Sequence, residues 1–402
     1  MRREFLKTLA LGAISAISTL PKSLLATKAN EWRQTKGQMA YRRLGRTNFF
    51  ISEVSLGGSP MPDWSLLRQI IERGVNYIDS SCSYDNGNAE RQIGRLCKEA
   101  GRDKMVVATK FHLRGSSIEE SIIRSVEGSL KRLDTDAIDV LSIHGAEREN
   151  DLVDERVLNA FEKLKRQGKY KFRGLSCHSN HEGVVRKAVD SGHYDVVQLG
   201  YNVFDIQDPE KDVKTYGDYL GASGLRDLIK YAASRDVGII AMKALKVGGR
   251  RQDLEKYRTR DTSLYQAMLK WVLENRNVTS VVTEMLNRDQ MEEDLSVVRS
   301  SLGSEERKNL FRYVAENSRD YCHMCGRCQA RCPSHIATTN ILRYLAYDES
   351  YGKTERAKKA YAELCPEKTA LACRNCGLCE DACPYAVRVR RRIREAQAIL
   401  AG

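Results

Sequence analysis

The chain has 402 residues, of which 42% are hydrophobic and 30% are charged, as in a globular protein rather than a disordered or fibrous one. This length suggests two or three domains. The net charge of +13 is unevenly spread, because residues 1–30 contribute +4, residues 318–402 contribute +6 and the middle only +3. This distribution argues against a nucleic-acid-binding protein. Nine of the 12 cysteines follow residue 321, and such crowding indicates disulfides or metal.

The first thirty residues have the layout of a signal peptide. Arg2 and Arg3 precede an apolar run of small residues, 8–17, that is too short to span a bilayer comfortably. The paired arginines followed by Phe-Leu-Lys resemble the twin-arginine export signal, and a frayed basic helix is the alternative. The resemblance implies that residues 1–30 engage the twin-arginine translocase, which carries folded chains, and that the mature protein is periplasmic or otherwise extracytoplasmic. No other segment is long enough for a transmembrane helix.

From residue 50 onward, short apolar runs alternate with helical patterns. The eight runs are rich in Val, Ile and Leu, as strands buried on both faces are; they span residues 51–57, 76–82, 105–111, 137–144, 172–176, 196–201, 237–244 and 278–283. Eight strand–helix units over about 250 residues predict an α/β fold, the (β/α)8 TIM barrel. A doubly wound open sheet is the alternative, but no G-x-G-x-x-G opens the region.

Chemically active residues follow several of these predicted strands, where barrel enzymes place their active sites. Asp79 ends the second strand with Tyr84 in the loop beyond it, Lys110 ends the third, and His144 ends the fourth. A buried lysine beside a tyrosine is expected to lower the pKa of the phenol. Asp79 would hold that lysine, and His144 would orient a carbonyl oxygen. The set predicts proton transfer between a carbonyl and an alcohol.

This region resembles the aldo-keto reductases. The resemblance begins at the opening segment 39–47, extends to about residue 310 and rests on the motifs Asp79-Ser-Ser-Cys-Ser-Tyr84, Ala89-Glu90, Ala108-Thr-Lys110 and Ser142-Ile-His144. It implies a reductase barrel over residues 38–312, with Asp79, Tyr84, Lys110 and His144 as the catalytic tetrad. The implied substrate is a small carbonyl compound or alcohol, and a sugar is one guess for an exported enzyme.

The same resemblance implies a nicotinamide cofactor, NAD(P)(H). Its expected contacts are Ser176, Gln198, Met242, Lys243 and Glu284. Glu284 lies where relatives carry basic residues around a 2′-phosphate, so the sequence favours NAD over NADP. Cys82 and Cys177 also fall near the barrel mouth, as packing residues or as an oxidation-sensitive pair.

The C-terminal cysteines follow one spacing twice. Each copy reads C-x-x-C-x-x-C-x-x-x-C-P, the pattern that places three thiolates on one [4Fe–4S] cluster and the fourth on its neighbour. Two clusters are therefore predicted, one held by Cys322, Cys325, Cys328 and Cys383, and the other by Cys332, Cys373, Cys376 and Cys379. Zinc sites use two pairs of ligands and need no third cysteine. A disulfide framework is the other alternative for an exported protein.

Residues 318–402 resemble the bacterial dicluster ferredoxins, with an insert of 40 residues between Cys332 and Cys373. The insert has helical composition at 340–348 and 354–364, which predicts a mainly α-helical domain. Cys365 has no assigned role. The arginine-rich run 388–394 offsets cluster charge, docks an acidic partner or forms a solvated helix face.

Together these features predict an exported oxidoreductase that relays electrons through two [4Fe–4S] clusters to a redox partner protein. Two alternatives stay open. The barrel could be a non-catalytic scaffold for an electron-transfer protein. Alternatively, the clusters could only stabilise the fold of an ordinary reductase.

Overall fold

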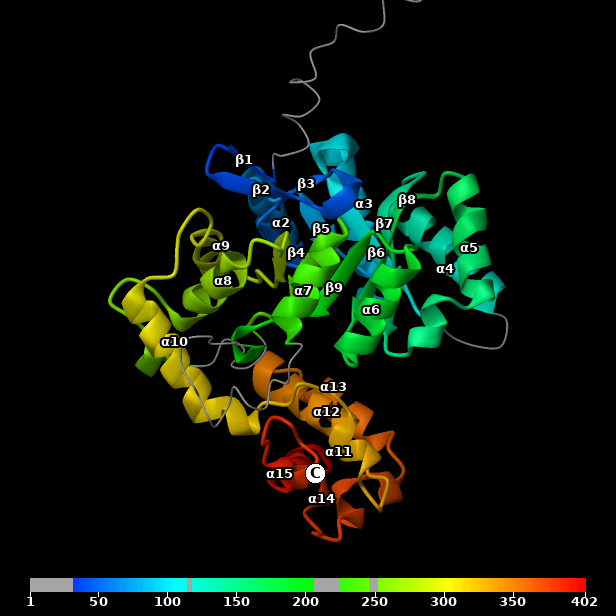
Figure 1. The fold of residues 1–402 in the computed structure, drawn as a ribbon. Helices are drawn as coiled ribbons and strands as arrows, with labels where there is room; N and C mark the ends of the chain where they lie inside the picture. Colours follow the sequence, from blue (N-terminus) through cyan, green and yellow to red (C-terminus); the bar gives the residue numbers. More distant parts are fainter. Residues whose placement is uncertain (1–31, 114–117, 206–223, 246–251) are drawn as a thin grey trace, which may run out of the picture.

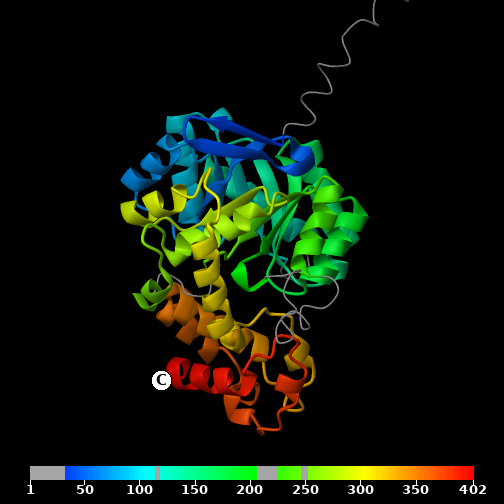
Figure 2. The same ribbon diagram turned by 60° about the vertical axis from the view of Figure 1, so that its left-hand side comes forward.

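The computed structural model describes residues 32–113, 118–205, 224–245 and 252–402. The predicted signal peptide, residues 1–30, lies outside the described residues. Two lobes are visible in both ribbon views, a larger one built around a barrel and a smaller helical one formed by the C-terminal part of the chain (Figures 1 and 2). Within the described residues, none of the helices has the length and apolar character needed to cross a bilayer.

The larger lobe contains a closed barrel of eight parallel strands, which confirms the predicted fold. Each strand pairs with its neighbours in chain order, and β11 closes the circle on β4. The strands are β4 Val54–Gly57, β5 Tyr77–Asp79, β6 Val106–Phe111, β7 Ile138–Ala146, β8 Tyr170–Cys177, β9 Val196–Gly200, β10 Gly238–Met242 and β11 Ser280–Thr283. One detail differs from the prediction, because the run 51–57 is divided between β4 and a separate strand, β3 Phe50–Ser52.

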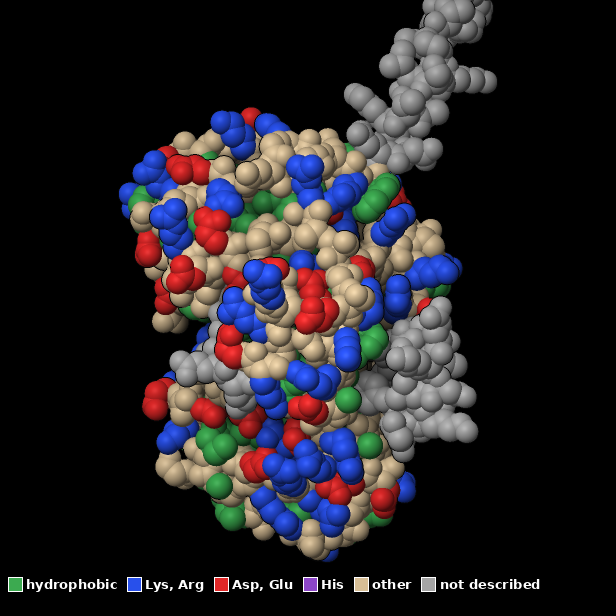
Figure 3. Space-filling view, turned by 90° about the vertical axis from the view of Figure 1, so that its left-hand side faces the viewer, with side chains coloured by type: hydrophobic (Ala, Val, Ile, Leu, Met, Phe, Trp, Pro, Cys, Tyr) green, Lys and Arg blue, Asp and Glu red, His purple; other side chains and the backbone are tan. Residues whose placement is uncertain are grey.

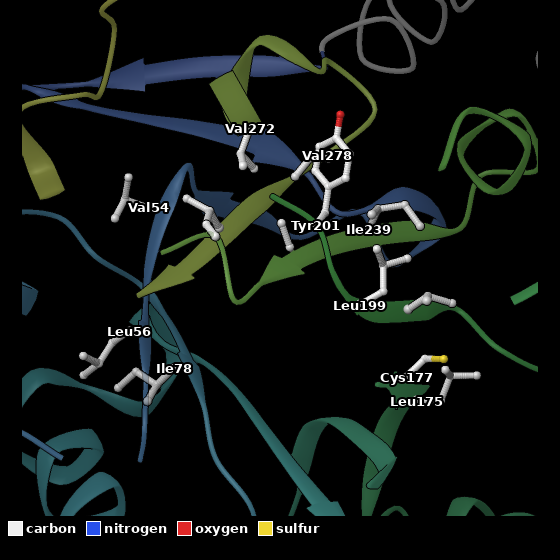
Figure 4. Close-up of a cluster of buried hydrophobic side chains, with 14 of the residues drawn as sticks. Val54, Leu56, Ile78, Leu175, Cys177, Leu199, Tyr201, Ile239, Val272 and Val278 are labelled. Atoms are coloured by element: carbon white, nitrogen blue, oxygen red, sulfur yellow. The ribbon is translucent and has the colours of Figure 1, made fainter. Parts of the chain in front are cut away.

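Helices surround the barrel and bury its outer face (Figure 1). They are α2 Trp64–Glu72, α3 Asn88–Ala100, α4 Ile118–Leu133, α5 Glu155–Arg166, α6 His181–Ser191, α7 Leu225–Ser234, α8 Leu264–Glu274 and α9 Arg288–Leu295. Figure 4 shows this layer, in which Leu56, Leu199 and Ile239 project from the strands toward the helices and are fully buried. Burying each such side chain contributes about 1.5–3 kcal/mol.

A three-stranded antiparallel sheet covers the end of the barrel remote from the smaller lobe (Figure 1). It consists of β1 Arg33–Lys36, β2 Met39–Arg43 and β3. The buried residues Leu44 and Ile51 join strand side chains such as Val140 and Ile240 in one cluster. These contacts close one end of the barrel, so among the described residues the barrel is open at the other end, where the strands finish.

The smaller lobe is mainly helical, as the sequence predicts. The connecting helix is α10 Ser304–Asn317, and the lobe contains α11 Arg327–Ala330, α12 Thr338–Tyr351, α13 Thr354–Ala362, α14 Leu378–Asp381 and α15 Val389–Leu400. Its small core includes Ile341, Leu345 and Ile393. The lobe lies at the carboxyl ends of the barrel strands (Figures 1 and 2). This placement brings α12 and α13 over the position where barrel chemistry is expected.

Candidate functional site

A cavity of about 1130 Å³ lies at the carboxyl ends of the barrel strands. Its walls come from both lobes. The barrel contributes Asp79, Tyr84, His112, His144, His178, Gln198, Met242, Lys243 and Glu284, among others. The smaller lobe contributes residues of α12, of α13 and of the link between them, including Arg343, Tyr347, Asp348, Lys353 and Arg356. The contribution of the smaller lobe was not predicted, because these residues lie about 200 positions or more beyond the catalytic motifs.

A buried ion pair forms the floor of the cavity. Lys110 Nζ, on β6, lies 2.5 Å from Asp79 Oδ1, at the end of β5, and also donates to the carbonyl of Ser80 at 2.7 Å. Both side chains are almost fully buried. Burial alone would lower the pKa of Lys110, but Asp79 and Tyr84 outweigh it and raise that pKa. Lys110 is therefore a fixed positive charge below the cavity.

Tyr84 stands directly beside this charge. It begins the 3₁₀ turn Tyr84–Gly87 after β5, and the Lys110 ammonium lies 5.1 Å from its ring centroid. Burial raises the pKa of Tyr84 and outweighs the lowering effect of Lys110. The expectation that the lysine lowers the phenol pKa overall is therefore wrong in direction, because desolvation of the phenolate is the larger effect. Tyr84 is a neutral phenol at ordinary pH.

His144 lies at the end of β7 with its ring edge against the ring of Tyr84, the centroids 5.6 Å apart. Burial, together with the nearby charge of Lys110, lowers the pKa of His144 to about 2, so the imidazole is neutral. Its Nδ1 shares a hydrogen bond of 2.8 Å with Ser81 Oγ. The ring of His112 stacks on the ring of His144, with the centroids 4.4 Å apart. Sequence reasoning missed His112, although its place immediately after the strand that carries Lys110 is a usable signal.

These two pKa directions predict a simple pH dependence. The rate of carbonyl reduction should stay constant from about pH 6 to 9 and fall only above about pH 10, as Tyr84 loses its proton. No histidine limb is expected near neutrality, because His144 stays neutral there. The measurement is kcat/KM against pH. An inflection near pH 6.5 that persists after replacement of His112 by Gln would contradict this assignment.

The expected nucleotide contacts divide into two groups. Gln198, Met242, Lys243 and Glu284 line the cavity, and the Gln198 amide donates to Asp79 Oδ2 at 3.0 Å. Ser176 is fully buried, and its hydroxyl accepts from the Gly145 amide at 2.9 Å. The cavity therefore fits the nicotinamide end of a dinucleotide through Gln198 and Met242, whereas Ser176 is engaged with the strand backbone.

The two barrel-mouth cysteines differ in environment. Cys177 is fully buried within the hydrophobic core, and its thiol donates to the carbonyl of Ser179 at 2.9 Å. Burial raises the pKa of Cys177 to about 12, which keeps the thiol protonated and unreactive. Cys82 is half-buried, and both are free thiols. The surroundings of Cys177 favour the packing interpretation over an oxidation-sensitive pair.

The C-terminal cysteines gather in two groups that draw on both motifs. Cys332 lines a small cavity together with Cys373, Cys376 and Cys379, so one thiol of the first motif joins three of the second. Cys328 is buried, which raises its thiol pKa, and the nearby thiols of Cys322, Cys325 and Cys383, followed by Cys379, raise it further. The four thiols around the small cavity fit a [4Fe–4S] cluster, and the thiols near Cys328 are close enough to affect its pKa.

One of these groups lies next to the barrel. Tyr385, two residues after Cys383, stacks on His323 with ring centroids 3.7 Å apart, and the ring centroids of His323 and Tyr321 are 4.7 Å apart. Tyr321 in turn stacks on Phe204, with ring centroids 4.5 Å apart. Phe204 belongs to the 3₁₀ turn Val203–Asp205, which follows β9. This continuous series of rings crosses from the Cys322–Cys325–Cys328–Cys383 group to the barrel. We call this group the proximal thiol set and the other the distal thiol set.

The arginine-rich run at the start of α15 is largely neutralised by neighbouring side chains. Arg390 pairs with Glu380 at 2.6 Å, Arg391 with Glu395 at 2.7 Å, and Arg394 donates to Asn375. The face in Figure 3 accordingly shows acidic side chains among the basic ones on the lower lobe. Arg390 also lines the cavity of the distal thiol set. Its position favours the charge-offset interpretation for this residue.

Comparison with known proteins agrees with both lobes. Residues 63–261 match the Aldo/keto reductase family, and residues 315–384 match the 4Fe-4S dicluster domain. The uncharacterized oxidoreductase YqkF of Bacillus subtilis is 28% identical over 295 residues, covering 67% of this chain and 94% of that protein. L-galactose dehydrogenase of Arabidopsis thaliana is 25% identical over 293 residues, covering 64% of this chain and 87% of that protein.

Solved structures share the barrel. The aldo-keto reductase AKR11C1 from Bacillus halodurans is 22% identical with a TM-score of 0.54, covering 68% of this chain and 95% of its own. An aldo-keto reductase from Klebsiella pneumoniae, solved in complex with NADPH, is 21% identical with a TM-score of 0.52 and covers 68% and 94%. The chain thus combines an aldo/keto reductase domain with a 4Fe-4S dicluster domain, and it is an oxidoreductase that acts on carbonyl or alcohol groups.

Proposed function

We propose that this protein is an exported enzyme that interconverts an alcohol and a carbonyl compound and exchanges the electrons with a redox partner protein through two [4Fe–4S] clusters. The observation that carries the proposal is the shared cavity. Tyr84 and His144 of the barrel face the same space as α12 and α13 of the iron–sulfur lobe. A barrel that served only as a scaffold would have no need of a buried Lys110–Asp79 pair beneath a tyrosine that faces a cavity.

In this proposal the tetrad moves one proton. During reduction the Tyr84 hydroxyl donates its proton to the carbonyl oxygen, and during oxidation the phenolate takes the proton of the alcohol. The fixed charge of Lys110 stabilises that phenolate, and Asp79 holds Lys110 in place through the 2.5 Å contact. Neutral His144, oriented by Ser81, donates a hydrogen bond to the substrate oxygen. Because its pKa is raised, Tyr84 is protonated at neutral pH and is therefore in the form that donates a proton during reduction.

The residues that would hold a nicotinamide are Gln198, Met242, Lys243 and Glu284. When bound, the cofactor would supply or accept a hydride at the substrate carbon. We propose NAD in preference to NADP, because the Glu284 carboxylate suits a ribose diol and repels a 2′-phosphate. Lys353 of the iron–sulfur lobe lies 3.7 Å from Glu284 and reduces that repulsion. We therefore expect the preference for NAD over NADP to be smaller than the sequence alone suggests.

Nucleotide titration tests the enzyme against the scaffold alternative. Cofactor fluorescence should show that the full-length protein binds NADH more tightly than NADPH. Glu284→Gln removes the carboxylate and should therefore bring the dissociation constants for the two nucleotides closer together. The matched control is Glu293→Gln, on α9 in the same segment, which should leave the ratio of the two dissociation constants unchanged. Tighter binding of NADPH by the unaltered protein would refute the charge argument. Binding of neither nucleotide would favour an electron-transfer protein with a non-catalytic barrel.

The proposed cluster ligands are the proximal set, Cys322, Cys325, Cys328 and Cys383, and the distal set, Cys332, Cys373, Cys376 and Cys379. When bound, each cluster would carry one electron at a time, whereas a nicotinamide would pass two electrons together as a hydride. The exchange would therefore need a group that accepts the pair and releases the electrons singly, such as a flavin. The aromatic series from Tyr385 to Phe204 supports electron exchange between the barrel and the proximal set. Each set includes one exposed cysteine, Cys325 in the proximal set and Cys376 in the distal set. Because the series of rings joins the proximal set to the barrel, we propose that the distal set meets the redox partner.

We propose a sugar-like, polyhydroxylated substrate. The cavity walls carry many groups able to pair with hydroxyls, including His112, His178 and Gln290, and no tryptophan or phenylalanine lines them within the described residues. A site of this kind rejects analogues that lack hydroxyl groups, because its own polar groups would stay unpaired. The likeness to L-galactose dehydrogenase supports this substrate class. The twin-arginine pattern at Arg2 and Arg3 supports a periplasmic location, which cell fractionation tests.

A further inference from the structure

We propose that Arg356, on the iron–sulfur lobe, binds an anionic group of the substrate, so that the natural substrate is a hydroxylated compound bearing a carboxylate or a phosphate. This inference rests on the proposed function of the cavity as the active site. It gives the iron–sulfur lobe a second role, as the part of the chain that selects the substrate. The argument depends on how the lobe reaches the cavity and on which of the cavity charges are already paired.

The segment from α12 to α13 is anchored to the barrel on two sides of the cavity. Arg343 of α12 pairs with Glu147, just beyond β7, at 3.1 Å. Lys353, between the two helices, donates to the Ser59 carbonyl beyond β4 at 3.2 Å and lies 3.7 Å from Glu284 beyond β11. Figure 1 shows α12 and α13 between the barrel and α15. The segment is thereby held across the barrel mouth, and the first turn of α13 carries Arg356.

Several cations of the cavity wall already have carboxylate partners. Arg343 and Lys353 pair as described, and Arg148 pairs with Asp151 at 2.9 Å. Arg356 differs from them. Among the parts of the chain that the structure describes, its recorded contact is with the ring of Tyr347, at 5.1 Å from the centroid, and it forms no ion pair there. An arginine in this position offers its planar array of donors to a ligand.

The cavity carboxylates do not supply the missing partner. Asp348 accepts a hydrogen bond of 2.6 Å from Thr354 Oγ1, and Asp85 accepts one of 3.0 Å from Asn88. Glu349 pairs with Arg392, outside the barrel mouth. Each of these carboxylates therefore has a partner near its own position, and the guanidinium of Arg356 stays available.

Arg356 is also close enough to the proposed chemistry to bind the molecule that reacts there. It lines the same cavity as Tyr84 and His144, and its charge lowers the pKa of both side chains. A carboxylate or phosphate can accept two parallel hydrogen bonds from one guanidinium, which fixes orientation as well as position. An anion held by Arg356 would place a neighbouring hydroxyl or carbonyl group of the same molecule over Tyr84.

The test compares matched neutral and anionic ligands by calorimetric titration of the full-length, cluster-loaded protein. Glycerol is compared with glycerate and glycerol 3-phosphate, and glucose with glucuronate and glucose 6-phosphate. At least one anion should bind about 10- to 100-fold more tightly than its neutral counterpart, as charge-assisted hydrogen bonds imply. Whether the carboxylates or the phosphates show the larger gain identifies the anionic group.

Two variants assign the effect to Arg356. Arg356→Gln should abolish the preference for anions, and Arg356→Lys should keep part of it, since an ammonium cannot form the paired contact. The control is Lys358→Gln on the same helix, where Lys358 Nζ donates to the carbonyl of the C-terminal Gly402; this variant should retain the full preference. Equal binding of neutral and anionic ligands, no anion bound at millimolar concentration, or a preference that persists in Arg356→Gln would each overturn the inference.

The outcome is separable from that of the proposed function, because binding requires no turnover. Anion binding without any alcohol–carbonyl exchange would refute the proposed function and leave Arg356 as an anion-binding residue. Turnover of neutral substrates without anion binding would support the proposed function and refute the role of Arg356.

Discussion

Replacing Tyr84 by phenylalanine should lower the rate of alcohol–carbonyl interconversion by about 10²- to 10⁴-fold, the usual effect of removing a positioned acid–base group. The change deletes one oxygen atom and leaves the ring against His144. Substrate binding should change little, because the loss falls on the step in which the proton moves. Steady-state kinetics on the full-length protein would therefore show the effect in kcat rather than in KM.

Two controls separate chemistry from damage to the fold. Iron content and thermal stability of Tyr84→Phe should match those of the unaltered chain. Tyr231→Phe, which removes a hydroxyl bonded to Asp190 on the outer surface, should retain full activity. If Tyr84→Phe keeps the activity of the unaltered chain, the proposed tetrad is wrong.

The second large effect concerns how the eight cysteines divide between the clusters. The double variant Cys332→Ser with Cys376→Ser should retain about four irons per chain, because both substitutions fall in the distal set. The matched variant Cys325→Ser with Cys332→Ser should retain almost none, because one cysteine is lost from each set. Iron and acid-labile sulfide analysis after anaerobic purification gives both numbers.

The opposite pattern would show that each motif holds its own cluster. In that case the first double variant would lose both clusters and the second would keep one. Cys365→Ser should leave about eight irons, since Cys365 belongs to neither set and is exposed. Zinc without labile sulfide in the unaltered protein would instead refute the cluster proposal as a whole.

The barrel could be predicted because each strand leaves a local signal. Strands buried on both faces are continuous Val, Ile and Leu runs, and the chemistry of the fold lies where those runs end. For this reason Asp79, Lys110 and His144 could be located without coordinates. The same pattern failed at residues 51–57, where two short strands of different sheets adjoin with only Glu53 between them.

Other features depend on contacts distant in sequence. The contribution of Arg343, Lys353 and Arg356 to the cavity arises from packing between the two lobes, which no local pattern records. The pKa of Tyr84 was expected to fall because a lysine is nearby, whereas the degree of burial decides its direction. Glu284 read alone is a repulsive charge, but Lys353 lies beside it in the fold.

The central claim is that the barrel and the clusters work on the same electrons. The most direct test is to add the alcohol substrate together with NAD anaerobically to oxidised full-length protein and record electron paramagnetic resonance spectra. We expect signals of reduced [4Fe–4S] clusters to appear in the unaltered protein and to be suppressed in Tyr84→Phe, whose clusters remain reducible by dithionite. An alcohol that is oxidised at full rate while both clusters stay oxidised would contradict the account and leave the clusters as structural elements.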